Sequence, residues 1–241
     1  MLEILYQDDY IVAINKPHGL LVHRSAIAAD TSECALQLLR DQLQQTVHPA
    51  HRIDRKTGGL LLFSRNKEMD SSLQQLFANK QIDKTYWAIV RGYTQDTGTI
   101  DYPLRKENGT MQDALTHYRT LARSEIDLPF GQHATSRYSL VELKPITGRM
   151  HQLRRHMAHI LHPILADRPH GCNKQNKLWK ERFHMDTMLL HAKTIAFKHP
   201  LTEAAIHIHA PLQQEFNRVL GILGLSDASG DAHAITENKT C

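Results

Sequence analysis

Apolar residues recur along this chain at two spacings, one typical of strands and one typical of helices. Strand-like runs occupy 4–15 (two strands around a turn at Asp8 and Asp9), 20–23, 60–63, 84–90, 116–121, 137–143, 189–197 and 206–209. Helical spacing predicts helices over 32–46, 69–77, 150–160 and 212–223. Because strands and helices do not alternate strictly, we expect an α+β fold (mixed α/β), with a mainly antiparallel mixed sheet flanked by helices and loops.

Polar stretches mark the boundaries of this organisation. Asp30 followed by Glu33 resembles a capping box at the start of the first helix. Residues 94–113 are polar, which predicts a loop. From residue 226 onward nearly all apolar character is lost, and such a segment cannot offset its ordering entropy. We therefore expect one domain over 1–225 and a disordered tail over 226–241.

Composition and charge narrow the class of protein. The 241 residues include 29 Lys and Arg against 25 Asp and Glu, a net charge of +4 that weakly favours an anionic partner. No apolar run approaches the roughly 18 residues of a membrane span, and the first ten residues contain three acids and no basic region of a signal peptide. Three widely spaced cysteines argue against a disulfide framework. We expect a cytoplasmic protein without membrane contact.

The first candidate for chemistry is the polar segment 51–59, HRIDRKTGG. Its one carboxylate, Asp54, lies between Arg52, Arg55 and Lys56. Because nearby cations favour the charged form, Asp54 should be ionised at neutral pH and available as a nucleophile or base. The alternative is a solvated surface loop with local ion pairs.

The second candidate, 147–156, begins a predicted helix and is rich in cations, which suits phosphate groups of a nucleic acid. Arg154 is next to apolar Leu153 and three residues before Met157, so it is expected to point inward and to need a carboxylate partner. A basic, solvated helix face is the alternative reading. The other basic residues of the segment are Arg149, His151, Arg155 and His156.

Other chemistry is less well supported by the residues. Tyr86, in the predicted strand 84–90, could stack on a base or move a proton, or could be a core aromatic. His156, His159 and His162 are spaced by three, but no HExxH motif or acidic cluster accompanies them. Motifs for nucleotide cofactors and for serine or cysteine hydrolases are also missing. We therefore expect neither a metal nor a cofactor.

Taken together, five segments in order resemble the RluA-type pseudouridine synthase family. The resemblance extends over about residues 1–210, and departs from the family pattern at Gly58, Met150 and Ala166. The matching segments are 14–23 (INKPHGLLVH), 51–59, 84–92 (KTYWAIVRG), 147–156 (TGRMHQLRRH) and 190–200 (LHA with HP).

The resemblance implies a fold, a reaction and a role for each site residue. It implies the pseudouridine synthase catalytic fold without an N-terminal S4 domain, and a cofactor-free isomerisation of tRNA uridine, at position 65 in the T arm. Asp54 would be the nucleophile or the group that triggers cleavage of the glycosidic bond, and Arg154 would be its partner. Tyr86 would pack on the flipped base and assist removal of the C5 proton. Arg52 would fill the gap that this base leaves. The remaining residues implied to bind substrate are His51, Arg55, Arg149, His151 and Arg155.

Two other functions stay open at this point. An rRNA-modifying member of the same family would have the same motifs, and a non-catalytic tRNA-binding protein could have the same fold. We expect a monomer, although the oligomeric state does not follow from the residues.

Overall fold

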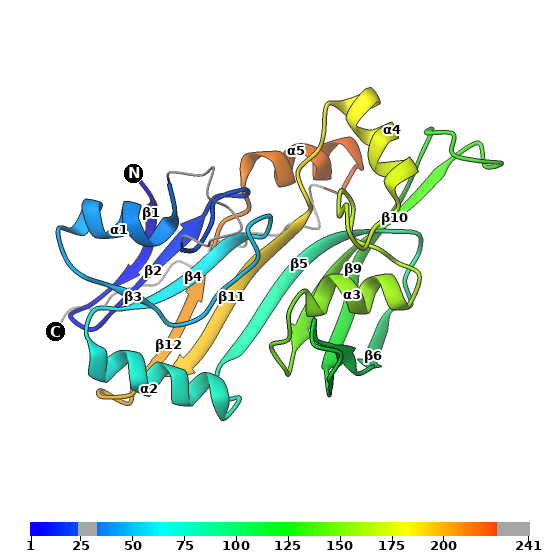
Figure 1. Ribbon diagram of the computed structural model, residues 1–241. Coiled ribbons are helices and arrows are strands. Elements are labelled where there is room, and N and C mark those ends of the chain that lie inside the picture. The colour runs from blue at the N-terminus through cyan, green and yellow to red at the C-terminus, as the bar shows by residue number, and fades with distance from the viewer. Residues whose placement is uncertain (24–32, 226–241) are drawn as a thin grey trace, which may run out of the picture.

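One large sheet organises the chain in the computed structural model, which describes residues 1–23 and 33–225 (Figure 1). The strands are β1 (Glu3–Gln7), β2 (Ile11–Lys16), β3 (His48–Pro49), β4 (Gly58–Ser64), β5 (Asp83–Arg91), β6 (Thr97–Asp101), β7 (Leu104–Arg105), β8 (Met111–Gln112), β9 (Leu115–Ile126), β10 (Ser136–Pro145), β11 (Leu190–Lys198) and β12 (Ala205–His209). The helices are α1 (Ala35–Leu43), α2 (Lys67–Ala78), α3 (Gln152–His159), α4 (Asn173–Phe183) and α5 (Gln214–Ile222).

The sheet contains ten strands in the order β1-β2-β4-β11-β5-β10-β9-β6, with β3 beside β4 and β12 beside β11. Its ladders are antiparallel except for the pairing of β11 with β4. Strands β7 and β8 form a separate hairpin. The predicted α+β class with a mainly antiparallel mixed sheet is confirmed.

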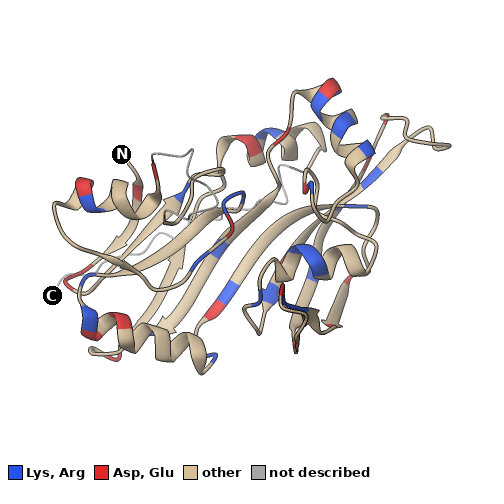
Figure 2. Cartoon of the chain, viewed as in Figure 1, with Lys and Arg blue, Asp and Glu red and all other residues tan. Residues whose placement is uncertain are grey.

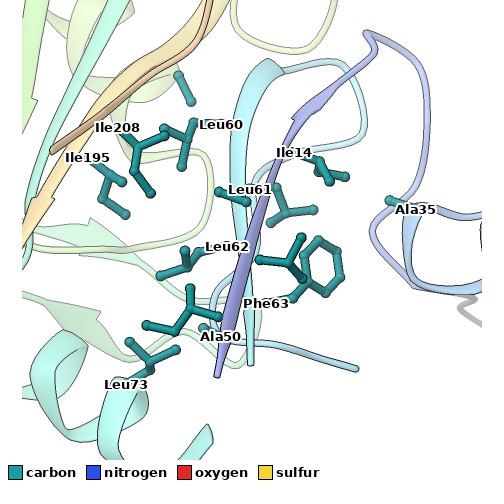
Figure 3. Packing of buried hydrophobic residues seen from close by; sticks show 14 of the residues in the cluster. Ile14, Ala35, Ala50, Leu60, Leu61, Leu62, Phe63, Leu73, Ile195 and Ile208 are labelled. Atoms are coloured by element: carbon teal, nitrogen blue, oxygen red, sulfur yellow. The ribbon is translucent and has the colours of Figure 1, made fainter. Parts of the chain in front are cut away.

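Strand β4 is the centre of the first hydrophobic cluster. All seven of its residues are buried, because both faces of the strand are covered. Figure 3 shows Leu61 and Phe63 on the side of Ile14, and Leu62 on the side of Leu73 from α2. A continuous apolar run therefore forms this strand, since no face needs polar residues.

Two further clusters fix the other helices. In one, Trp179 of α4 and Phe216 of α5 pack on the β5 and β10 part of the sheet. In the other, Leu153 and Met157 of α3 pack on the opposite positions of the same strands. These contacts hold helix α3 against one face of the sheet (Figure 1).

Three expectations about elements need correction. Residues 20–23 form no strand, and only Leu21 makes a β-bridge, to Cys34. The segment 94–113 is not a plain loop, because it contains β6, β7 and β8, which are short and largely exposed edge elements. The apolar pattern does not predict helix α4, because most of its residues are polar and exposed. Its buried residues are Gln175 and Trp179.

Two expectations, the capping residue Asp30 and the tail 226–241, lie outside the described residues. Within the described ranges, no helix is both long enough and apolar enough to cross a membrane.

Candidate active site

A pocket of about 600 Å³ opens between the end of α2 and the start of α3. Residues of the loop 50–57 and of the start of β5 also line it. Figure 2 shows Lys and Arg on this loop and on α3. The pocket lining includes the cations Arg52, Lys84 and Arg149. Seven of the nine predicted site residues line the pocket: His51, Arg52, Asp54, Tyr86, Arg149, His151 and Arg154.

The loop that holds Asp54 is fixed by the turn after β2. The N–H of Gly19 donates to the carbonyl of Arg55 (2.9 Å), and Nε of Arg55 donates back to the carbonyl of Gly19 (2.9 Å). Nζ of Lys16 donates to three carbonyls, of Pro17 (2.8 Å), Leu20 (2.9 Å) and Arg55 (3.1 Å). Burial lowers the pKa of Lys16 to about 7, although the charge of Asp54 opposes this shift. Lys16 therefore joins the two loops from inside the protein.

The end of the same loop requires glycine. Gly59 has φ +100°, and a Cβ on it would lie 2.3 Å from the carbonyl oxygen of Ala192. This close approach occurs where β4 pairs with β11 in parallel. The glycine thus allows the loop after Asp54 to enter the sheet directly beside β11.

Arg154 points inward and contacts two carboxylates. Its Nη1 donates to Oδ2 of Asp54 at 2.9 Å, while Nε and Nη2 donate to Oδ2 and Oδ1 of Asp167, both at 2.8 Å. Burial by itself would lower the pKa of Arg154, but the bonds to Asp167 and Asp54 raise it. The guanidinium is therefore a permanent cation, held by Asp167 and presented to Asp54.

Tyr86 faces the pocket from β5. Burial, with the charge of Asp54, raises the pKa of its hydroxyl well above the ordinary value. The phenol is therefore protonated at neutral pH, so in the resting protein it can donate a hydrogen bond or pack against a ring.

His51 lines the pocket, but one of its ring nitrogens is already used. Nε2 accepts a hydrogen bond from the backbone N–H of Leu62 (3.1 Å), and the ring packs on Phe77 with centroids 4.9 Å apart. Burial, with the nearby charge of Lys84, lowers the pKa of His51 to about 3. This ring is neutral and attaches the loop to β4.

The start of α3 is built on a network around Gln152. Its Oε1 accepts from Oγ1 of Thr147 (2.7 Å) and from the N–H of Arg149 (3.0 Å), and its Nε2 donates to the carbonyl of Leu115 (3.0 Å). His151 precedes the helix in the left-handed conformation, with φ 53°. The helix begins at Gln152, so Met150 lies before it and is exposed.

Two predicted residues lie outside the pocket lining. Arg55 contacts Gly19, as described above, and Nη1 of Arg155 donates to the carbonyl of Arg105 at 3.0 Å. The buried carboxylate Asp167 was missed as the partner of Arg154, and His170, which bonds His151, was missed as well. The inward position of Arg154 indicated that a carboxylate was needed, but not which one. Across the described ranges, no group of three or more His, Cys, Asp or Glu side chains is arranged to hold a metal ion.

The sequence of this chain is similar to those of known proteins. The RNA pseudouridylate synthase family matches residues 10–159. The chain is 43% identical to tRNA pseudouridine synthase C of Vibrio cholerae, over 95% of this chain and 98% of that protein. It is 44% identical to tRNA pseudouridine synthase C of Haemophilus ducreyi, over 92% and 96%.

Solved structures agree with the fold. Human RNA Pseudouridylate Synthase Domain Containing 4 superposes with a TM-score of 0.72 at 28% identity, over 92% of this chain and 93% of that one. Human RNA Pseudouridylate Synthase Domain Containing 1 has a TM-score of 0.69 at 21% identity, over 93% and 95%, and shows the fold alone.

Proposed function

Because this chain belongs to the RNA pseudouridylate synthase family, we propose that it isomerises uridine to pseudouridine in tRNA. The proposed target is uridine 65 in the T arm, as the resemblance of the sequence motifs implies. Relatives named tRNA pseudouridine synthase C match at 43% and 46% identity over 95% and 90% of the chain. This similarity over nearly the whole chain supports tRNA rather than rRNA as the substrate.

The observation that supports catalysis is the contact of Asp54 with Arg154, 2.9 Å, inside the pocket. A volume of about 600 Å³ is large enough for a nucleoside. A base in an RNA stem is stacked and paired, so it must flip out before it can reach Asp54, at a cost of a few kcal/mol. A solvated surface loop would need neither the buried arginine nor the pocket.

The reaction breaks the bond from C1′ of the ribose to N1 of uracil and forms a bond from C1′ to C5. Asp54 begins it by attacking the sugar or the base, or by taking a sugar proton. Arg154 orients the carboxylate of Asp54. The ring of Tyr86, whose hydroxyl is protonated, packs against the flipped base. The isomerisation transfers no electron or group from another molecule, so its chemistry needs no cofactor.

Cations around the opening would bind tRNA phosphates. Arg52, Lys84 and Arg149 line the pocket. We assign to Arg52 the role that the family resemblance implies, which is to fill the gap left by the flipped base. His51 and His151 also line the pocket, and we assign them to substrate binding. Arg55 and Arg155, outside the lining, are assigned to flanking phosphates. Affinity should therefore fall with added salt. The monomeric state and the cytoplasmic location stay predictions of the sequence.

The test is Asp54→Asn, assayed by release of tritium from tRNA containing 5-tritiated uridine. Turnover should fall by about 10³-fold or more, because the acid acts on the reacting atoms, while tRNA affinity changes little. Asp41→Asn, on α1 away from the pocket, is the matched control. Retained activity in Asp54→Asn would refute the assignment. Pseudouridine missing from rRNA instead of tRNA, in cells without the protein, would refute the substrate.

A further inference from the structure

His151 and His170 form a hydrogen-bonded pair beside Asp54. Nδ1 of His151 and Nε2 of His170 are 3.0 Å apart, and the ring planes meet edge to face at 70°. The other nitrogen of His151, Nε2, is 3.9 Å from Oδ2 of Asp54. The two rings therefore lie in series, with Asp54 at one end.

Each ring is held in place by the backbone around it. His151 is in the left-handed conformation, which is uncommon for a residue with a side chain and is found at functional sites. The N–H of His170 lies 3.4 Å from Oδ1 of Asp167, the carboxylate that holds Arg154. His170 does not line the pocket and is only partly buried, so its free side can reach water.

A neutral imidazole has one N–H donor and one acceptor nitrogen. In this pair, a proton can therefore enter at Nε2 of His151 while another passes from Nδ1 of His151 to Nε2 of His170. A third leaves Nδ1 of His170 to water. The pair ends neutral in its other tautomer, and the reverse movement brings one proton back.

We propose that His151 and His170 are a relay that carries protons between Asp54 and water during the isomerisation, an inference that rests on the proposed function. When the new C1′–C5 bond has formed, the C5–H bond breaks and its electron pair restores the double bond of the ring. The proton passes to the Asp54 carboxylate and out through the pair. N1 of the product must gain one proton, and the reverse movement supplies it, so the relay returns to its first tautomer.

His170 is thus a residue that acts through His151 and does not touch the substrate. Burial lowers the pKa of both rings, and Arg154 and Arg155 contribute in the same direction, while Asp54 opposes the shift at His151 and Asp167 opposes it at both. Both rings are therefore neutral at physiological pH, as the relay requires.

The experiment measures the single-turnover rate of pseudouridine formation and of tritium release with full-length protein and 5-tritiated tRNA. We expect His170→Ala and His170→Gln to be slower by about tenfold or more, with tRNA affinity unchanged. Imidazole in solution should accelerate His170→Ala toward the wild-type rate, because it fits the space and moves protons. It should not accelerate His170→Gln, whose side chain fills the space, or the wild-type protein.

The outcomes separate this inference from the proposed function. Wild-type protein that releases no tritium overturns the proposed function and the relay with it. Active wild-type protein with unslowed His170 variants overturns the relay alone. A slow His170→Ala that binds tRNA but does not respond to imidazole also overturns it, because a purely structural role would give that result. If His170→Ala does not fold, His170→Gln at the wild-type rate is the overturning result.

Discussion

The single positive charge of Arg154 contacts two carboxylates, and these two carboxylates are not equivalent. Asp167 is 1% exposed and receives two parallel bonds, whereas Asp54 is 23% exposed and receives one. Two parallel bonds fix the plane of a guanidinium. Asp167 therefore sets the direction of Nη1, and Nη1 sets the position of Asp54. We infer that Asp167 is a positioning residue.

This inference predicts the effect of Asp167→Asn. The amide cannot accept both bonds, so Arg154 loses half of its anchoring and one buried charge loses a partner. We expect unfolding free energy to fall by about 3 kcal/mol and kcat to fall about tenfold or more, with KM for tRNA nearly unchanged. Asp186→Asn, an exposed carboxylate paired with Lys180, should change neither. Wild-type kcat in folded Asp167→Asn would contradict the inference.

At the scale of single residues, the sequence predicts well which catalytic side chains come together. It does not predict which other residues hold them in position. Arg154 between apolar neighbours predicts an inward cation, and the structure pairs it with Asp54. Asp167 could not be predicted as its second partner, because the turn before it depends on the left-handed backbone of Ala166, with φ 62°. The same limit applies to His51, since the bond to Leu62 exists only once the loop lies on β4.

Among the elements, β4 links the core to the catalytic loop. Its buried run Leu60–Phe63 pairs with β2, and Phe63 also pairs with β3. Its first two residues are the glycines after the loop, which pair with β11. Because Gly59 lies against the backbone of Ala192, neither side can move away without breaking the ladder to β11. The position of Asp54 is thus determined by how closely two strands approach each other.

We therefore expect Gly59→Ala to destabilise the protein by several kcal/mol, on the order of 4, because a Cβ would meet backbone atoms. Gly109→Ala is the matched control. Gly109 also has positive φ (+87°), but a Cβ there would meet nothing within 4 Å, so only the conformational cost of about 1–2 kcal/mol applies. Urea unfolding of both variants measures the difference. Equal losses would show that the close approach is unimportant.

Long apolar patterns predicted the elements that form the core, and short polar ones did not predict the rest. The apolar run of β4 and the helical spacing of apolar residues in α2 can be recognised in the sequence, because these residues are the ones that become buried in the core. Strand β6 has only Ile100 buried, and α4 buries a polar residue, Gln175, along with Trp179. Gln175 is satisfied by the hydroxyl of Tyr138 at 3.0 Å, a partner distant in the sequence. Such elements depend on tertiary contacts that periodicity does not contain.

On the scale of the whole molecule, neutral histidines surround the place where the turn after β2, the catalytic loop and β11 meet. His191 is fully buried on β11, with its ring 6.3 Å from that of His18 and 6.2 Å from that of Phe216. Burial, with the charge of Lys16, lowers the pKa of His18 to about 4, and burial, with His18 and Lys193, lowers that of His191 to about 3. With His51, whose pKa burial lowers to about 3, three rings in this region stay neutral in the folded protein at pH values where an unfolded histidine is charged.

These rings make the folded state sensitive to acid. At these three positions the unfolded chain binds protons below about pH 6.5, whereas the folded protein does so only near pH 3 to 4. Stability present above pH 6.5 is therefore lost as the pH falls. Because His191 is fully buried, it should contribute about 1.4 kcal/mol per pH unit to that loss between pH 6 and 4.

His191→Leu removes this titration and should flatten the dependence of unfolding free energy on pH by that amount. Urea unfolding at pH 6, 5 and 4 measures it. His207→Leu, at an exposed position of β12, is the control and should leave the slope unchanged. If His191→Leu loses stability with acid as steeply as the wild-type protein, the ring is protonated in the folded state. The region beside the catalytic loop would then have to admit a buried positive charge.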